Sequence, residues 1–287
     1  MTEGGLEVVR IVLVEPAGPL NVGSIARVMK NMGLSHLVLV NPHCDPLDPE
    51  ARKMAVHAAD VLEAAKQVTS LPEALQGCQR AIATTARPRS LTTILEPPAL
   101  ALPWLVEASP YPLQSALIFG PEDRGLSNQE LNYAQRFVCI PSHPAYPALN
   151  LAQAVAVCCY ELYQSVGNQG GMTPTKDPNP KPALSAVEGS KIQNLKSKIQ
   201  SPEEENHGEI PPTPFPSASA DTLEGYYQHL ETLLLKIGYL HPHTTAARME
   251  KFRRLFNRAY LSDAEVAMLR GILRQMDWAL DQSHEQS

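Results

Sequence analysis

The chain has 287 residues, a hydrophobic fraction of 44% and a formal net charge of −6 at pH 7. This length predicts two domains and a linker, and the acidic balance excludes a polycation that binds nucleic acid in bulk, although not a local basic face. The five cysteines form no Cys-x-x-Cys pair and no zinc pattern, which predicts reduced thiols and a cytoplasmic protein. The N-terminus has no signal-peptide pattern, and no apolar run is long enough to predict a membrane span.

The first residues predict a strand, a helix and a second strand. Val8–Val14 and Leu34–Val40 are apolar runs typical of buried parallel strands. The helix between them is expected to be capped by Ser24 or, a turn earlier, by Asn21, and to end at Gly33 in a left-handed conformation. Such a unit implies a right-handed crossover, and therefore a parallel sheet.

The next elements predict a ligand site at a strand end. Ala51–Ala65 has helical spacing, and a second helix is expected over Leu71–Leu75, capped by Ser70. Arg80–Thr84 is a short strand that runs into Thr85-Ala86. Polar residues just past a strand end are candidate ligand contacts, and a threonine-rich turn is the alternative.

The strand Ser115–Gly120 leads into a loop that is bracketed by Gly120 and Gly125. The spacing of the two glycines is similar to that of a phosphate-binding loop, but the Lys-Ser/Thr pair that would follow is missing, so no such loop is expected. Ser127 and Glu130 form a capping-box pattern, which predicts the start of a helix.

The stretch Phe137–Tyr160 is the one around which the domain is expected to be organised. It combines a short apolar strand, Phe137–Ile140, a loop with three prolines and a helix over Asn150–Leu162 that is apolar almost all round. This combination predicts a central element that is buried on several sides. Because ligands of α/β proteins bind beyond the carboxyl ends of strands, the proline-fixed loop is the expected site.

The remaining residues predict a linker and a small helical domain. Residues 167–220 hold nine prolines and few aromatics, which is typical of a disordered linker. Residues 221–287 return to helical periodicity, with Asp221 and Ser262 as caps and Gly238 as a helix end. The three expected helices are Thr222–Ile237, Thr245–Tyr260 and Asp263–Leu280.

The middle helix of this domain carries a basic stripe. Its members are Arg248, Lys251, Arg253, Arg254 and Arg258, against one acid, Glu250. Such a run is usually a solvated helix face, but on an appended domain it also fits an RNA-binding surface. His241 and His243 lie nearby without a Cys or carboxylate partner, so no metal site is expected.

Three motifs together resemble those of the SpoU/TrmH-type branch of the SPOUT methyltransferases. They are Pro19–Arg27 with the helix to Gly33, Ile118–Leu126, and Ile140 followed by Leu149–Ala152. Their order and spacing are highly specific, whereas each alone is weak. The C-terminal domain resembles the tail of TrmJ-type tRNA methyltransferases in the runs Tyr226–Leu234, Met249–Ala259 and Leu269–Leu273.

The resemblance implies an α/β SPOUT fold in residues 1–166, with a parallel sheet and a C-terminal trefoil knot, followed by the disordered linker and an all-α RNA-binding domain. It implies S-adenosylmethionine as the cofactor, tRNA as the partner, and a homodimer with the site at the subunit interface. The implied reaction is 2′-O-methylation of ribose at nucleotide 32 of the anticodon loop. The alternatives are ribosomal RNA as the substrate, or a non-catalytic RNA-binding dimer.

Motif matching also implies the site residues. The active-site group would be Asn21, Arg27, Glu122 and Asn150. The cofactor contacts would be Thr84, Thr85, Ala86, Gly120, Ile140, Ala148, Leu149 and Asn150. The RNA contacts would be Arg27 and the basic stripe. Ile140 and Leu149 would enclose an apolar adenine face, and Gly120 would let the backbone approach the ligand.

The implied chemistry explains why such residues are needed. Methyl transfer from a sulfonium requires an oxygen nucleophile held in line, and a ribose hydroxyl must lose its proton or be stabilised by positive charge. Arg27 is the base that is proposed for the family, but a guanidinium stays protonated at neutral pH. We therefore expect Arg27 to hold an RNA phosphate and stabilise the alkoxide, with Glu122 orienting Arg27 or Asn21. Ala148 stands where many relatives carry serine, so a hydroxyl contact is lost.

Overall fold

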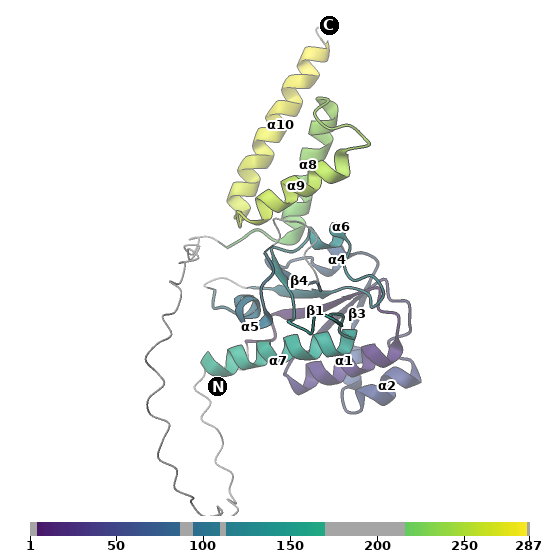
Figure 1. The fold of residues 1–287 in the computed structure, drawn as a ribbon. Helices are drawn as coiled ribbons and strands as arrows, with labels where there is room; N and C mark the ends of the chain where they lie inside the picture. The colour runs from purple at the N-terminus through teal and green to yellow at the C-terminus, as the bar shows by residue number, and fades with distance from the viewer. Residues whose placement is uncertain (1–4, 87–93, 110–112, 170–215, 286–287) are drawn as a thin grey trace, which may run out of the picture.

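The computed structural model describes residues 5–86, 94–109, 113–169 and 216–285 (Figure 1). The described strands form one parallel sheet in the order β3-β2-β1-β5-β4-β6. They are β1 (Val9–Val14), β2 (His36–Val40), β3 (Lys66–Val68), β4 (Arg80–Thr84), β5 (Ser115–Phe119) and β6 (Arg136–Val138). The parallel α/β sheet predicted from the sequence is therefore confirmed.

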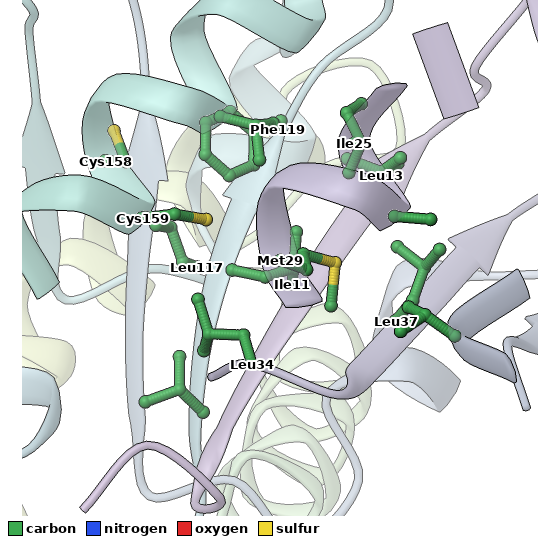
Figure 2. Close-up of a cluster of buried hydrophobic side chains, with 14 of the residues drawn as sticks. Ile11, Leu13, Ile25, Met29, Leu34, Leu37, Leu117, Phe119, Cys158 and Cys159 are labelled. Carbon is green, nitrogen blue, oxygen red and sulfur yellow. The ribbon is translucent and has the colours of Figure 1, made fainter. Parts of the chain in front are cut away.

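Helices cover both faces of this sheet. One face carries α1 (Pro19–Asn31), α2 (Pro49–Ala55), α3 (Ala59–Glu63), α5 (Pro98–Ala101), the 3-10 helix η1 (Leu102–Leu105) and α7 (Leu151–Gln169). The other face carries α4 (Leu71–Ala74) and α6 (Asn128–Leu131). Alternate residues of each strand point to opposite faces, so Ile11 and Val12 lie in different buried clusters. Figure 2 shows side chains of β1, α1, β5 and α7 meeting in the larger cluster.

The first helix begins earlier than predicted. Its N-cap is Gly18 and its first residue is Pro19, whose fixed φ suits that position. The prediction that Ser24 or Asn21 caps the helix is therefore wrong, and Asn21 lies inside the first turn with its side chain available for other contacts. Gly33 has φ +73°, which confirms the predicted left-handed end.

The single helix predicted over Ala51–Ala65 is wrong, because the chain breaks at Val56. This residue has φ +54° and separates α2 from α3. The segment then ends in the edge strand β3, which the sequence analysis missed because two of its three residues are polar and exposed. The close packing of α2 on α1 depends on Gly23, where a Cβ would lie 2.1 Å from the Ala51 carbonyl oxygen.

The strand predicted to be central lies at the edge of the sheet. β6 pairs only with β4 through a regular ladder, and it ends at Val138 rather than Ile140. Its outer side is covered by Glu96, whose N–H donates to the Phe137 carbonyl (3.0 Å) and whose carbonyl accepts from the Cys139 N–H (3.0 Å). This cover explains why an edge strand has an apolar sequence.

The long helix α7 is buried on one face only. Leu151, Val155 and Cys158 are within the core, whereas Val157 (37% exposed) and Tyr160 (48% exposed) face outward. The expected burial on several sides is therefore incomplete in a single chain. The helix continues past residue 166, the predicted domain end, to Gln169. The trefoil knot implied by the resemblance stays a prediction.

The C-terminal body has its own core, built from α8 (Ala220–Lys236), α9 (Thr245–Asn257) and α10 (Asp263–Glu285). Ser219 rather than Asp221 caps α8, because its hydroxyl accepts from the Thr222 N–H. Of the predicted linker, residues 170–215 lie outside the described residues. Residues 216–220 belong to the helical body, because the Ala218 N–H donates a hydrogen bond to the Leu261 carbonyl. None of the described helices has the length and apolar character to cross a membrane.

Candidate active site

An open cavity of about 200 Å³ lies beyond the carboxyl ends of β4, β5 and β6. Its walls come from the strand ends, the loop 120–126 and the segment 147–154. Seven of the eight residues predicted to contact a cofactor line it, namely Thr84, Thr85, Ala86, Gly120, Ile140, Ala148 and Leu149. The structure thus gathers residues from three separate stretches of the chain around one cavity, at the sheet edge where ligands of α/β proteins bind.

Gly120 is needed for the shape of the loop itself. A Cβ at this position would lie 2.3 Å from the Leu126 nitrogen and 2.5 Å from the Gly125 carbonyl carbon. The prediction that Gly120 lets the backbone approach a ligand stays a prediction; the close neighbour that the structure describes is the returning backbone of the loop. Gly125, at φ +64°, makes the turn that brings this backbone back.

An ion-pair network that the sequence analysis missed holds this loop. Arg124 reaches Glu15 (2.7 Å) after β1 and Glu130 (2.9 Å) in α6, and Glu130 also accepts from the Ser127 N–H (2.5 Å). The capping box of Ser127 and Glu130 was predicted, and the structure confirms it. Burial raises the pKa of Glu130, but the hydrogen bonds from Arg124 and Ser127 outweigh it and hold that pKa below its ordinary value.

A Glu130→Gln variant is therefore expected to be less stable by about 1–2 kcal/mol at neutral pH, since it loses charged hydrogen bonds at a half-buried site. The depressed pKa means that the carboxylate stabilises the folded state fully above pH 4.5, its ordinary pKa, and that this contribution disappears as the pH falls through the lower folded pKa. Urea unfolding of both proteins at pH 7, 5 and 4 measures the difference, and a gap that stays constant below pH 4.5 contradicts this account.

Beside the cavity, three polar side chains from distant segments form a hydrogen-bonded chain. The Asn21 amide in α1 donates to the Glu122 carboxylate (2.6 Å), and the Asn150 amide donates to the Asn21 oxygen (3.1 Å). The Asn150 oxygen in turn accepts from the Ala152 N–H (2.9 Å), so this residue caps α7. These hydrogen bonds orient the three groups relative to one another without a ligand.

Arg27 does not join this cluster within one chain. Leu20 and Arg27 are seven residues apart and share the exposed face of α1, whereas Asn21 points roughly 120° away around the helix. In the described part of the chain the Arg27 side chain makes no hydrogen bond or ion pair. Of the two roles expected for Glu122, orienting Asn21 is therefore the one that a single chain displays.

The five residues of the basic stripe separate into two groups. Arg248, Lys251 and Arg258 are exposed. Arg254 pairs with Glu250 on its own helix. Arg253 is largely buried and forms a bidentate pair with Glu224 (2.6 and 2.9 Å). Its role is therefore structural, and it does not belong to the exposed cations of the predicted RNA surface.

His241 and His243 stack with their ring centroids 5.9 Å apart. Among the residues that the structure describes, no group of three or more His, Cys, Asp or Glu side chains is arranged to hold a metal ion.

A parallel α/β sheet with a cavity beyond its strand ends is the architecture of an α/β protein that binds a small ligand. The sequence model of the SpoU rRNA Methylase family matches residues 8–160, and that of the C-terminal domain of the tRNA methyltransferase TrmJ matches residues 221–286. The chain therefore belongs to the SpoU methylase family and is a methyltransferase, which confirms the resemblance read from the three motifs and the C-terminal runs.

Named relatives agree with this assignment along nearly the whole chain. The tRNA (cytidine/uridine-2'-O-)-methyltransferase TrmJ of Pectobacterium atrosepticum is 38% identical over 96% of this chain and 100% of its own length. The tRNA (cytidine/uridine/adenosine-2'-O-)-methyltransferase TrmJ of Pseudomonas aeruginosa is 38% identical, with 94% of both chains covered. The crystal structure of TrmJ from Z. mobilis ZM4 is similar with a TM-score of 0.71 and 28% identity, covering 93% of this chain and 98% of that chain.

Proposed function

We propose that the protein transfers the methyl group of S-adenosylmethionine to the 2′-hydroxyl of a ribose in tRNA, at nucleotide 32 of the anticodon loop, and that it does so in the cytoplasm. The observation that carries the proposal is the fixed chain of Asn150, Asn21 and Glu122 beside the cavity. The relatives named above are tRNA 2′-O-methyltransferases that match both parts of the chain.

The cavity suits the chemistry of this cofactor. Ile140 and Leu149 offer apolar walls for an adenine ring, and the backbone of the 120–126 loop offers amide groups for its polar edge. Glu122 supplies a carboxylate at the rim, where a sulfonium cation is favoured by charge. When bound, the cofactor supplies an electrophilic methyl group.

The residues of this chain then have to position the acceptor hydroxyl, whose proton passes to solvent water as the oxygen takes the methyl group and the bond from that methyl group to sulfur breaks. Asn21 and Asn150 are held with their amides oriented, so they can hydrogen-bond a ribose without reorganising. The Glu122 carboxylate accepts a hydrogen bond from the Asn21 amide and so orients it; an ionised carboxylate can only accept hydrogen bonds. The Arg27 guanidinium would bind the phosphate beside the ribose and stabilise the developing alkoxide.

The exposed apolar side chains favour a homodimer. Leu20 (49% exposed) on α1 and Tyr160 on α7 face outward from two helices that pack on each other, and Leu149 and Tyr146 (80% exposed) belong to the loop before α7. Such a patch on a helix that is otherwise core marks an interaction surface. Pairing of two copies through this patch would cover α7 and place Arg27, which shares the Leu20 face, at the interface.

This arrangement predicts complementation between two inactive variants. Arg27→Ala and Asn21→Ala are each expected to lose at least about 100-fold in kcat/KM. If Arg27 of one copy serves the Asn21 cluster of the other, mixing the two variants under subunit exchange restores about one quarter of wild-type activity, because half of the dimers then contain one intact site. Activity of the mixture that stays at the level of the separate variants contradicts a shared site.

The function itself is tested by incubating the purified protein with radiolabelled S-adenosylmethionine and unmodified tRNA. We expect label in tRNA and a primer-extension stop at nucleotide 32. No label in any RNA identifies a non-catalytic RNA-binding protein, and label in ribosomal RNA alone identifies the other substrate class.

A further inference from the structure

We propose that the C-terminal helical domain is held on the catalytic domain in one fixed orientation, and that this orientation positions tRNA relative to the active site. The second half of the proposal rests on the proposed function. The docking interface, as we call it, is defined by two sets of residues. Gly77, Cys78, Trp104, Asn132 and Tyr133 belong to the catalytic domain, and Ala220, Asp221, Arg253, Asn257 and Tyr260 to the helical domain.

A buried amide lies at the centre of the docking interface. Asn257, only 8% exposed, accepts a hydrogen bond from the Tyr227 hydroxyl of its own domain (2.8 Å). Its amide donates across the interface to the Asn132 carbonyl (2.9 Å), which lies 125 residues earlier in the chain. A buried amide that lost this partner would be left unsatisfied, so the bond favours the docked arrangement over a displaced one.

One turn earlier on α9, Arg253 links the same two domains. Its guanidinium lies 4.5 Å from the ring centroid of Tyr227 and 5.4 Å from that of Tyr133, which belongs to the catalytic domain. Glu224 neutralises its charge from within the helical domain. The buried cation therefore contacts an aromatic ring on each side of the interface, an attraction that depends on the distance to both rings.

A third contact lies just past the end of α9. The Tyr260 ring meets Trp104 edge to face, with centroids 5.8 Å apart and an interplanar angle of 65°. Arg80 and Arg136 hold Trp104 from the catalytic side, at 5.2 and 5.5 Å from its ring. Tyr260 has φ +49°, a costly conformation for an aromatic residue that persists only where its surroundings impose it.

The start of α8 supplies a fourth contact. The Asp221 carboxylate accepts from the Gly77 N–H (2.9 Å), and the Ala220 N–H donates to the Cys78 carbonyl (2.8 Å). The anchors on the catalytic domain thus belong to three separate segments: the turn before β4, the turn after α6, and η1. Figure 1 shows the helical domain standing on this side, with α8 and α9 next to α4 and α6. Contacts on three segments resist pivoting, which a single hinge would allow.

The fixed orientation has a functional consequence. The exposed cations Arg248 and Lys251 lie on α9, the same helix that carries Arg253 and Asn257 of the interface, and the exposed Arg258 is the residue that caps the end of this helix. Their distance from the Asn21–Glu122–Asn150 cluster is therefore set by the docking interface. A tRNA that binds both surfaces meets a preorganised pair of sites, which raises affinity without adding any contact.

The test uses the full chain and its two tryptophans. In a Trp278→Phe background, Trp104 is the single tryptophan and therefore the fluorescent reporter. Its aromatic contact across the interface is with Tyr260 and not with Asn257, the residue that is substituted. Asn257→Ala removes the bond to Asn132 and is expected to raise quenching of Trp104 by acrylamide. The KM for tRNA should rise about tenfold while kcat stays within about twofold and cofactor affinity is unchanged.

Tyr227→Phe is the matched control, because it removes the bond of Asn257 within its own domain and leaves the bond across the interface. It is expected to behave like the parent protein. Asp221→Ala, at the opposite corner, repeats the test if Asn257→Ala does not fold. Unchanged quenching in both Asn257→Ala and Asp221→Ala overturns the docking, and increased quenching with an unchanged KM overturns the positioning role. Absence of methylation by the parent protein refutes the proposed function alone, since quenching still tests the docking.

Discussion

Gly120→Ala is expected to lower kcat/KM at least about 100-fold and to abolish measurable cofactor binding, which corresponds to about 2.7 kcal/mol of lost transition-state stabilisation. The added methyl group would lie 2.3 Å from the backbone nitrogen of Leu126, and backbone cannot rotate away as a side chain does. The loop 120–126 must therefore open, and it forms one wall of the cavity and carries Glu122.

Calorimetric titration with S-adenosylmethionine and a methylation assay measure this effect. Gly271→Ala is the control, because a Cβ there meets nothing within 4 Å and the residue lies in the interior of α10. It should leave activity unchanged and stabilise the helical domain by about 0.5–1 kcal/mol through helix propensity. A Gly120→Ala protein that binds cofactor with the affinity of the wild type would contradict this prediction, because the loop would then have moved without any loss of cofactor affinity.

Arg253→Ala is expected to have the largest effect on stability, a loss of about 3–5 kcal/mol in the helical domain. The reason is that Glu224, whose side chain is only 17% exposed, would be left as a largely desolvated carboxylate without its partner. The rings of Tyr227 and Tyr133 would also lose the cation between them. Thermal and urea unfolding of the full chain measure the loss.

Arg258→Ala, at the residue that caps the end of α9, is the matched control. Its side chain is exposed, so stability should change by no more than about 0.5 kcal/mol, while affinity for tRNA falls and its salt dependence becomes shallower. The two substitutions are therefore expected to have different effects: Arg253→Ala lowers the stability of the protein, and Arg258→Ala lowers its affinity for tRNA. Equal stability of the two variants would contradict the assignment of Arg253 to the interior.

Much of the catalytic domain was predictable because its signals are local. Short apolar runs gave β1, β2, β4 and β5, and the capping box gave α6. The motifs also named side chains that the structure brings together, among them Asn21, Glu122 and Asn150. Their assembly depends on pairing between distant segments, so only the likeness to a family, and no periodicity, placed them in one site.

Three of the misses share a physical cause, since each depends on a tertiary partner. The polar β3 is a strand only because β2 lies beside it, and Val56 breaks a helical pattern where the chain turns under α1. Arg253 belongs to a basic run in the sequence, yet its environment is set by Glu224 and two tyrosines that no spacing connects to it. A run of basic residues in the sequence therefore does not show which of its side chains are exposed to solvent in the folded protein.

The hydrogen-bonded chain of Glu122, Asn21 and Asn150 has a consequence during synthesis on the ribosome. The Asn21–Glu122 hydrogen bond joins residues 101 positions apart in the sequence, and the Asn21–Asn150 hydrogen bond joins residues 129 positions apart. Asn150 directly precedes α7. A nascent polypeptide that has emerged only as far as β6 already contains most of the sheet but cannot yet form the site. With the proposed function, activity on RNA therefore requires that α7 has folded onto the core, and a chain that lacks this helix is expected to be inactive.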